Sequence, residues 1–209
     1  MAHTEDAGSK ASFFCSETKK NIFLIGDSIR KGYCSTVKEE LSDVAEVFYV
    51  DDNCRNTQYV ITCLYGWSTR FSDPSRVDLV QFNCGHWDTA HWFGSPLPLT
   101  SEQEYQRNIG YIIDQLRKLF PNAEIVFATT TTMNPEDDSS GRNPRSTVEI
   151  ARYNELAVKV AAEKGVAVHD LFSVTKDWDA SCYADYCHFT AETNQRLGHT
   201  VAELLRKRI

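Results

Sequence analysis

Two short segments at opposite ends of the chain contain the residue types that serine-based hydrolysis requires. Near the start, Gly26-Asp27-Ser28 follows an apolar run, and near the end Asp185 precedes His188 by three positions. A serine hydroxyl is a weak nucleophile that needs an adjacent base, and an imidazole can serve as that base. A carboxylate can then fix the imidazole tautomer and stabilise the imidazolium. Together these residues predict Ser28 as nucleophile, His188 as base and Asp185 as the group that orients His188.

Each segment alone has a simpler interpretation. Asp27 or Ser28 can cap a helix that begins after a strand, and an Asp-x-x-His pair often occurs by chance. A helix start also presents backbone N–H groups that favour developing negative charge. Because both segments occur in one chain, in positions that can meet in an α/β fold, the catalytic interpretation is the stronger one.

The elements that must position these residues alternate along the chain. Short apolar runs typical of strands buried on both faces occupy residues 21–25, 45–50, 77–82, 123–128 and 166–168. Amphipathic helix patterns between and after them include residues 101–116, 147–164 and 191–207. This alternation predicts an α/β fold with five parallel strands and about five helices on both faces.

In such open sheets the functional site lies beyond the carboxyl ends of the strands. Three polar clusters directly follow strand patterns, at residues 26–28, 51–57 and 83–88. The stretch 133–146 has the composition of a surface loop, and we expect it near the site.

Length and charge limit the remaining possibilities. The 209 residues favour one domain, predicted over 21–209, after a flexible N-terminal arm at 1–20. The formal net charge of −7, from 22 basic and 29 acidic residues, argues against nucleic acid or an anionic membrane as partner. The chain contains no apolar stretch of the roughly 20 residues that span a bilayer. The polar start lacks the features of a signal peptide, which favours a cytoplasmic location.

The seven cysteines have an odd count and irregular spacing, which does not indicate a disulfide framework. Cys187 beside His188, or Cys84 near His86, offers metal-ligand atoms. Neither pair has an ordered second pair at zinc-site spacing, so the sequence disfavours a metal site. We expect no cofactor, because a serine, a base and amide donors suffice for hydrolysis.

Four blocks in order along the chain, at residues 26–28, 53–57, 83–88 and 185–188, resemble those of the SGNH or GDSL hydrolases. The resemblance extends from about residue 21 to the end. It implies a three-layer α/β/α flavodoxin-like fold and ester hydrolysis through an acyl-serine. By this resemblance Ser28 attacks the carbonyl carbon, His188 is the base and Asp185 orients it.

The resemblance also implies an oxyanion hole formed by the Ser28 amide, an amide of the second block and an asparagine of the third block. Two positions depart from the family pattern. Cys54 stands where the family usually has glycine, and Trp87 stands where it has the asparagine. We therefore predict that the Cys54 amide and the Asn83 side chain take these roles. The alternative for Asn83 is a turn residue that bonds its own backbone.

Six further residues are candidates for substrate binding, namely Asp27, Arg55, Asn56, His86, Trp87 and Trp92. Aromatic faces suit sugar rings, although burial of apolar area is an equally good interpretation of the tryptophans. The predicted function is a carbohydrate O-acetylesterase acting on a small-molecule or oligosaccharide ester. The alternatives are a lipase, lysophospholipase or thioesterase for acyl chains, and a catalytically inactive domain that binds a saccharide or a protein.

Overall fold

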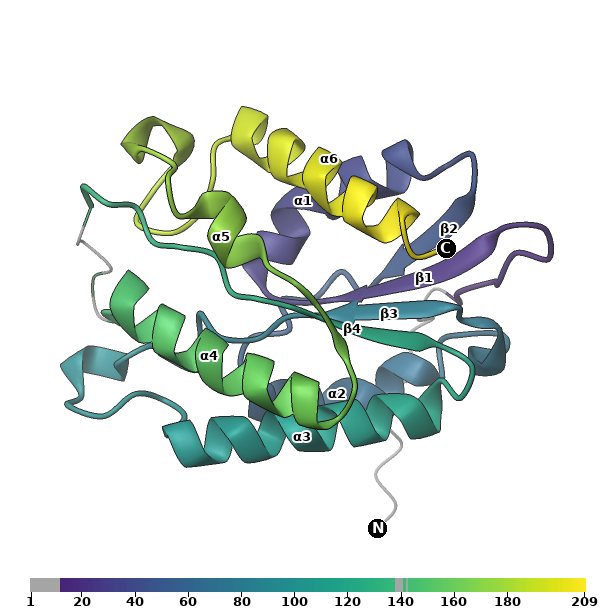
Figure 1. The fold of residues 1–209 in the computed structure, drawn as a ribbon, viewed down its shortest axis with the longest axis horizontal. Coiled ribbons are helices and arrows are strands. Elements are labelled where there is room, and N and C mark those ends of the chain that lie inside the picture. Colours follow the sequence, from purple (N-terminus) through teal and green to yellow (C-terminus); the bar gives the residue numbers. More distant parts are fainter. Residues whose placement is uncertain (1–11, 138–140, 142) are drawn as a thin grey trace, which may run out of the picture.

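Five parallel strands form one sheet in the order β2-β1-β3-β4-β5 (Figure 1). The computed structural model describes residues 12–137, 141 and 143–209. The strands are β1 (Lys20–Ile25), β2 (Ala45–Tyr49), β3 (Leu79–Phe82), β4 (Glu124–Ala128) and β5 (Ala167–His169). Each strand lies within a residue or two of its predicted range, which confirms the predicted parallel sheet.

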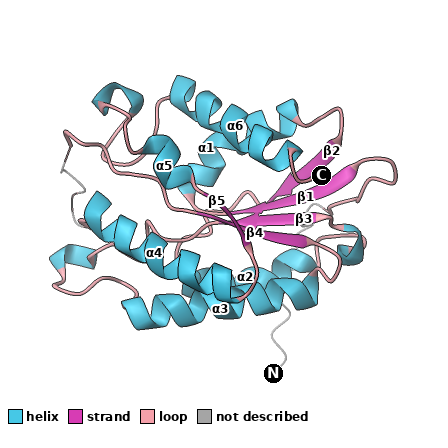
Figure 2. Cartoon of the chain, in the orientation of Figure 1, coloured by secondary structure: helices cyan, strands magenta, loops and turns pink. Residues whose placement is uncertain are grey.

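Helices cover both faces of the sheet (Figure 2). One layer contains α1 (Ser28–Glu40), α5 (Leu171–Thr175) and α6 (Ala191–Arg206). The opposite layer contains α2 (Thr57–Ser68), α3 (Glu102–Leu119) and α4 (Thr147–Glu163). This arrangement confirms the three-layer α/β/α fold expected from the sequence. No helix of the described residues is long and apolar enough to cross a membrane.

The central strand β1 explains why its sequence is an unbroken apolar run. Phe23 and Ile25 point into the core beneath α2 and α3, whereas Ile22 and Leu24 point into the core beneath α1 and α6. All four side chains are almost completely buried. A parallel strand covered on both faces therefore has no position left for the alternating polar residues of a half-exposed strand.

The strand order places the switch point of the sheet between β1 and β3. The chain leaves β1 for β2 on one side and returns to β3 on the other. Ile25 pairs with Phe82 in the register of these two strands, and the Asn83 amide donates to the Ile25 carbonyl at 3.1 Å. The loops after β1 and β3 therefore begin side by side, at the position where open α/β sheets bind ligands.

The predicted N-terminal arm is partly attached to the domain. Phe13 forms an isolated parallel bridge with Phe71, and their rings lie 5.0 Å apart. The Phe13 ring also lies 5.3 Å from that of Phe48. The described end of the predicted arm is thus attached to the domain through Phe13, which packs against the core. Residues 1–11 of the predicted arm lie outside the described residues.

Candidate active site

Ser28 is the first residue of α1 and lies directly after the carboxyl end of β1. The preceding Asp27 is the N-cap, and its carboxylate accepts a hydrogen bond of 3.0 Å from the Ile29 amide. Asp27 has no exposed surface, and burial raises its pKa above the usual value. Asp27 thus holds the helix start rather than facing a substrate, and the cap leaves the Ser28 hydroxyl free for another partner.

That partner is His188, in a chain of hydrogen bonds formed by three side chains. His188 Nε2 lies 2.8 Å from Ser28 Oγ, and His188 Nδ1 lies 2.7 Å from Asp185 Oδ2. The Asp185 carboxylate also accepts from the Cys187 and His188 amides at 2.9 and 2.7 Å. Burial acts to raise the pKa of Asp185, but these amides and the imidazole lower it below its usual value.

An ionised Asp185 accepts a hydrogen bond from the Nδ1–H group, which keeps the proton on Nδ1 and leaves Nε2 as the acceptor for the Ser28 hydroxyl proton. The predicted trio is thus brought together in the order that base-assisted nucleophilic attack requires.

The loop that carries Asp185 and His188 is supported from both sides. The Ala184 amide donates to the His188 carbonyl at 2.7 Å, which closes the loop upon itself. From the chain after β4, the Asn134 amide donates to the Tyr186 carbonyl at 2.9 Å. The Asn134 side chain donates to the Asp185 carbonyl at 3.3 Å. These bonds fix the backbone that sets the direction of the imidazole.

Asn83 lies against the loop that leads to Ser28. A side chain at Gly26 would overlap the Asn83 side-chain oxygen and crowd the Cβ of Arg30. Glycine is therefore required at position 26 for this close approach. Asn83 is 6% exposed, and its side-chain oxygen has no hydrogen-bond partner among the described residues. The structure thus brings Asn83 against Gly26, two residues before the nucleophile, and its role as an oxyanion donor stays a prediction.

The second predicted oxyanion donor points elsewhere. The Cys54 amide donates to the Gly26 carbonyl at 3.1 Å, and the Arg55 amide donates to the Asn53 side chain at 3.0 Å. The geometry therefore does not support Cys54 as an oxyanion donor. The amide at this position instead ties the second loop to the loop that carries Ser28.

Arg30 strengthens this connection and was not singled out from the sequence. Its side chain is 1% exposed, and its guanidinium donates to the carbonyls of Gly26, Val50 and Asp52 at 3.1, 3.0 and 2.5 Å. A buried cation is costly unless hydrogen bonds satisfy it. Here one guanidinium joins the backbone of the first loop to two points of the second. The sequence around Arg30 resembles that of any helix with a polar residue at this position, so it does not indicate this role.

Asp88 joins the second and third loops in a similar way. The fully buried Asp88 carboxylate accepts from the Thr57 hydroxyl at 2.7 Å and from the Thr57 amide at 3.1 Å. Burial raises its pKa to about 6, against the opposing effect of the Thr57 donors.

Asn56, which we predicted to bind substrate, is the N-cap of α2, and its side chain accepts a hydrogen bond from the Tyr59 amide. Its side chain therefore has a structural partner.

His86 is also held within the protein rather than presented to a ligand. It is 2% exposed, and its Nε2 lies 3.1 Å from the Thr131 hydroxyl. Burial, together with the nearby Arg145, lowers the pKa of His86 well below its usual value, so the ring is neutral. Arg145 donates to the His86 carbonyl at 2.6 Å. The prediction that His86 binds substrate thus conflicts with its burial.

Comparison with known proteins agrees with this geometry. The sequence profile described as the GDSL-like lipase/acylhydrolase family matches residues 24–196. The chain belongs to this family. Family membership indicates an ester hydrolase, and the match spans all four blocks noted in the sequence. No curated protein sequence matches the chain.

Several solved structures share the GDSL fold at low sequence identity. A lipase/acylhydrolase from Enterococcus faecalis is 18% identical, with 90% of this chain and 96% of that chain covered and a TM-score of 0.72. The acetyl xylan esterase AlAXEase is 16% identical, with 88% and 98% covered and a TM-score of 0.67. Est24, a carbohydrate acetylesterase from Sinorhizobium meliloti, is 16% identical, with 91% and 100% covered and a TM-score of 0.67. These similarities establish the fold of the chain.

The loop after β3 carries a pair of neighbouring tryptophans. The rings of Trp87 and Trp92 lie 5.5 Å apart, and both side chains are partly exposed. On the second loop, the exposed Arg55 has a φ of 48° and lies over the Tyr59 ring at 4.7 Å. Of the six predicted substrate-binding residues, Arg55, Trp87 and Trp92 therefore combine accessible surface with a position on a site loop.

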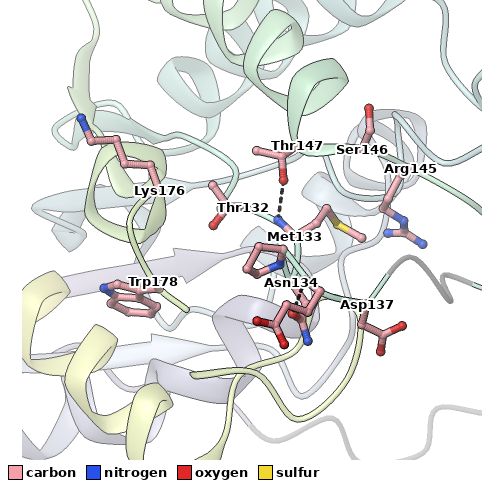
Figure 3. A pocket seen from close by; sticks show the side chains of 11 residues that line it. Thr132, Met133, Asn134, Asp137, Arg145, Ser146, Thr147, Lys176 and Trp178 are labelled. Atoms are coloured by element: carbon pink, nitrogen blue, oxygen red, sulfur yellow. Dashed lines mark hydrogen bonds between the residues drawn. The ribbon is translucent and has the colours of Figure 1, made fainter. Parts of the chain in front are cut away.

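A hollow of about 530 Å³ is lined by both polar and apolar residues (Figure 3) and is connected through Asn134 to the loop of Asp185 and His188. Asn134, which bonds that loop, is part of its lining, and Figure 3 shows the Thr147 hydroxyl accepting from the Met133 amide. Arg145, Lys176 and Trp178 also line it, whereas Ser28 and His188 do not. Residues at both ends of the predicted loop 133–146 line this hollow, so the loop lies near the site, as expected. Residues 138–140 and 142 of that loop lie outside the described residues.

Proposed function

We propose that the protein is a serine esterase that removes small acyl groups, chiefly acetyl, from carbohydrate hydroxyls. The observation that carries the proposal is the hydrogen-bonded chain from Ser28 through His188 to Asp185. A serine with a positioned imidazole and an ionised carboxylate is the arrangement that acyl transfer to a hydroxyl requires.

In the proposed reaction, Ser28 Oγ attacks the acetyl carbonyl carbon while its proton moves to His188 Nε2. The tetrahedral intermediate collapses when the sugar oxygen leaves and takes the proton from Nε2. This step leaves an acetyl-Ser28 ester. A water molecule then attacks that ester with His188 as base, and acetate departs as Ser28 recovers its proton. Asp185 stays ionised throughout and stabilises each imidazolium state.

The oxyanion formed at each attack needs hydrogen-bond donors. The Ser28 amide lies at the N-terminus of α1, where the helix dipole favours negative charge. The Asn83 side chain lies against Gly26, two residues before Ser28, which supports it as the second donor. We assign the oxyanion to these two groups, each worth about 2.7–4 kcal/mol in the transition state. The Cys54 amide is omitted because it already donates to Gly26.

Two observations favour a sugar as the alcohol component. Partly exposed Trp87 and Trp92 lie on the loop after Asn83, and an indole face suits the apolar face of a sugar ring. Two of the structural relatives are named as an acetyl xylan esterase and a carbohydrate acetylesterase. We also propose a cytoplasmic location, which the seven free cysteines support.

One observation favours a second candidate, an esterase for longer acyl chains. On the loop that follows Trp92, Leu97 is 71% exposed and Leu99 is 41% exposed. Exposed apolar side chains near a site loop can hold an acyl chain.

The deciding experiment measures acetate release from acetylated xylo-oligosaccharides and hydrolysis of p-nitrophenyl esters from acetate to decanoate. We expect the highest kcat/KM on acetate, with Ser28→Ala lowering kcat at least about a thousandfold. Ser181→Ala, which changes an exposed serine near α6, is the matched control. Rates that rise with chain length would favour the second candidate. Hydrolysis that survives in Ser28→Ala would refute the proposed nucleophile, and binding of oligosaccharide without hydrolysis by the unaltered protein would indicate an inactive binding domain.

As a further test of the sugar proposal, Trp87→Ala should raise KM for the acetylated oligosaccharide and leave KM for p-nitrophenyl acetate nearly unchanged. Equal effects on both substrates would mean that the indole supports the loop rather than the sugar.

A further inference from the structure

The loop that carries Asp185 and His188 brings together three different kinds of metal-binding atom. Asp185, Cys187 and His188 each offer one ligand atom, and these atoms lie within 4.8 Å of one another. Cys187 Sγ lies 3.7 Å from His188 Nδ1, which is itself 2.7 Å from Asp185 Oδ2. The sequence disfavoured a metal site because it offered no second pair of ligands at zinc-site spacing. The folded loop supplies the third ligand from the carboxylate.

We infer that Asp185, Cys187 and His188 form an inhibitory site for a thiophilic divalent cation such as Zn²⁺. Binding of the cation depends on the geometry of the loop alone. Its inhibitory effect rests on the proposed esterase function, because it acts on the same imidazole.

The sulfur–nitrogen distance suits a tetrahedral ion. Zn–S and Zn–N bonds of about 2.3 and 2.0 Å, at tetrahedral angles, place sulfur and nitrogen about 3.5 Å apart. The observed Cys187–His188 separation of 3.7 Å is close to that value. The Asp185 oxygen must move outward from Nδ1 by roughly half an ångström to reach its tetrahedral position. A rotation of a carboxylate side chain provides such a movement.

The surroundings allow entry and favour soft cations. The side chains of His188 and Asp185 are 39% and 44% exposed, so the cation can arrive from solvent and keep a water as fourth ligand. Cys187 is 3% exposed and packs against Met133 and Ile150, which fixes the sulfur in place. A thiol among the ligands selects Zn²⁺ or Cd²⁺ over Mg²⁺ and Ca²⁺, which prefer oxygen ligands.

Binding of the cation moves two protons, and this movement explains the inhibition. The Cys187 thiol releases one proton to solvent as its sulfur binds the cation. His188 Nδ1 must give its lone pair to the cation, so the imidazole proton moves from Nδ1 to Nε2. With Nε2 protonated, His188 can no longer accept the Ser28 proton. Asp185, as a ligand of the cation, is also withdrawn from its role beside the imidazole.

Cobalt titration tests the binding without relying on catalysis. Co²⁺ occupies zinc sites and gives a thiolate-to-metal charge-transfer absorption when a cysteine is a ligand. We expect this absorption in the Ser28→Ala variant, which lacks the nucleophile, and its loss when Cys187→Ser is added. Cys63→Ser, which removes a partly exposed cysteine of α2, is the matched control and should keep it. Tris(2-carboxyethyl)phosphine keeps the thiols reduced during the titration.

Zinc titration of the active protein tests the consequence. We expect Zn²⁺ to inhibit hydrolysis of p-nitrophenyl acetate at micromolar concentration, and Mg²⁺ and Ca²⁺ not to inhibit it. Relative to each variant's own zinc-free rate, Cys187→Ser should raise the half-inhibitory Zn²⁺ concentration about 100-fold, and Cys63→Ser should leave it unchanged. Cys187→Ala serves in place of Cys187→Ser if circular dichroism shows that the latter fails to fold.

The outcomes separate the two proposals. Absence of the cobalt–thiolate absorption in Ser28→Ala overturns the metal site, whatever the activity. Equal zinc inhibition of the Cys187 and Cys63 variants also overturns it, because the cation then binds elsewhere. If the protein shows no esterase activity but the Cys187-dependent absorption is present, the proposed function fails and the metal site stands.

Discussion

Ser28 Oγ and His188 Nε2 lie 2.8 Å apart although 160 positions separate the two residues in the chain. Ser28 begins α1, and His188 lies just before Thr190, the N-cap of α6. The two helices lie side by side on one face of the sheet (Figure 1). The packing of α1 against α6 therefore helps to bring the nucleophile and the base together.

Gly198 in α6 permits that close packing. A Cβ at this position would lie 2.6 Å from the Cβ of Thr36 in α1. We expect Gly198→Ala to push the helices apart, destabilise the fold by about 1–3 kcal/mol and lower kcat by disturbing the contact of His188 with Ser28. Urea unfolding and p-nitrophenyl acetate kinetics measure the two effects.

Gly66→Ala is the matched control, because a Cβ at this glycine of α2 meets no atom of the described residues within 4 Å. It should raise the free energy of unfolding by roughly 0.5–1 kcal/mol through helix propensity and leave kcat unchanged. If Gly198→Ala also raised stability and kept full activity, the packing of α1 on α6 would not control the site.

Asn83 provides a test of the proposed oxyanion hole. Asn83→Ala removes the proposed side-chain donor and should lower kcat about a hundredfold or more, with little change in KM. The reason is that the oxyanion exists in the transition state and not in the bound ester. Asn122→Ala, at a distant turn where the side chain bonds the Ser75 carbonyl, is the control. An unchanged kcat in Asn83→Ala would assign the oxyanion to other donors.

Arg30 is predicted to act as a positioning residue. Arg30→Lys keeps the charge, but one ammonium group cannot replace a planar guanidinium that reaches the Gly26, Val50 and Asp52 carbonyls together. We expect kcat to fall about tenfold or more while KM changes little, because the loop that carries Ser28 loses its anchor to the second loop. Lys31→Arg, at an exposed neighbouring position, is the control.

Circular dichroism distinguishes this effect from unfolding. If the Arg30→Lys protein is folded and has an unaltered kcat, the guanidinium contributes to stability alone.

The sequence was sufficient for the strands because each leaves a local signal. It also predicted the serine, histidine and aspartate that the structure brings within hydrogen-bond distance of one another. A strand buried on both faces must be apolar throughout, and β1 shows why. The direction in which a loop amide points has no such signal. The Cys54 amide donates to the Gly26 carbonyl because two loops that are far apart in the sequence meet in the fold.

Which polar residues are buried was equally hard to predict from the sequence. Asp27 and His86 were predicted to bind substrate because they stand in clusters that directly follow strand patterns, yet the folded chain covers both. Arg30 was missed for the opposite reason, since charged helix residues are usually exposed. A charged residue two positions after the nucleophile was the one available hint, and it did not reveal the three carbonyls that the guanidinium joins.

Asp88 predicts a particular pH dependence of stability. Its pKa is about 6 in the folded protein, against a usual value of 3.8, because burial disfavours the carboxylate. Between about pH 4 and pH 6 the folded state therefore binds more protons at this site than the unfolded state. The contribution of Asp88 to the free energy of unfolding must then fall as pH rises through this range, by about 3 kcal/mol in all. Above about pH 7 it should be constant.

Other groups titrate in the same range, so the measurement is the difference between the unaltered protein and Asp88→Asn, which cannot titrate at this position. Urea unfolding followed by tryptophan fluorescence from pH 4 to pH 8 gives the two free energies. We expect their difference, unaltered protein minus variant, to decrease with rising pH and then level off. A difference that rises with pH would mean that the Thr57 donors outweigh burial and that the carboxylate is stabilised where it joins the second and third loops.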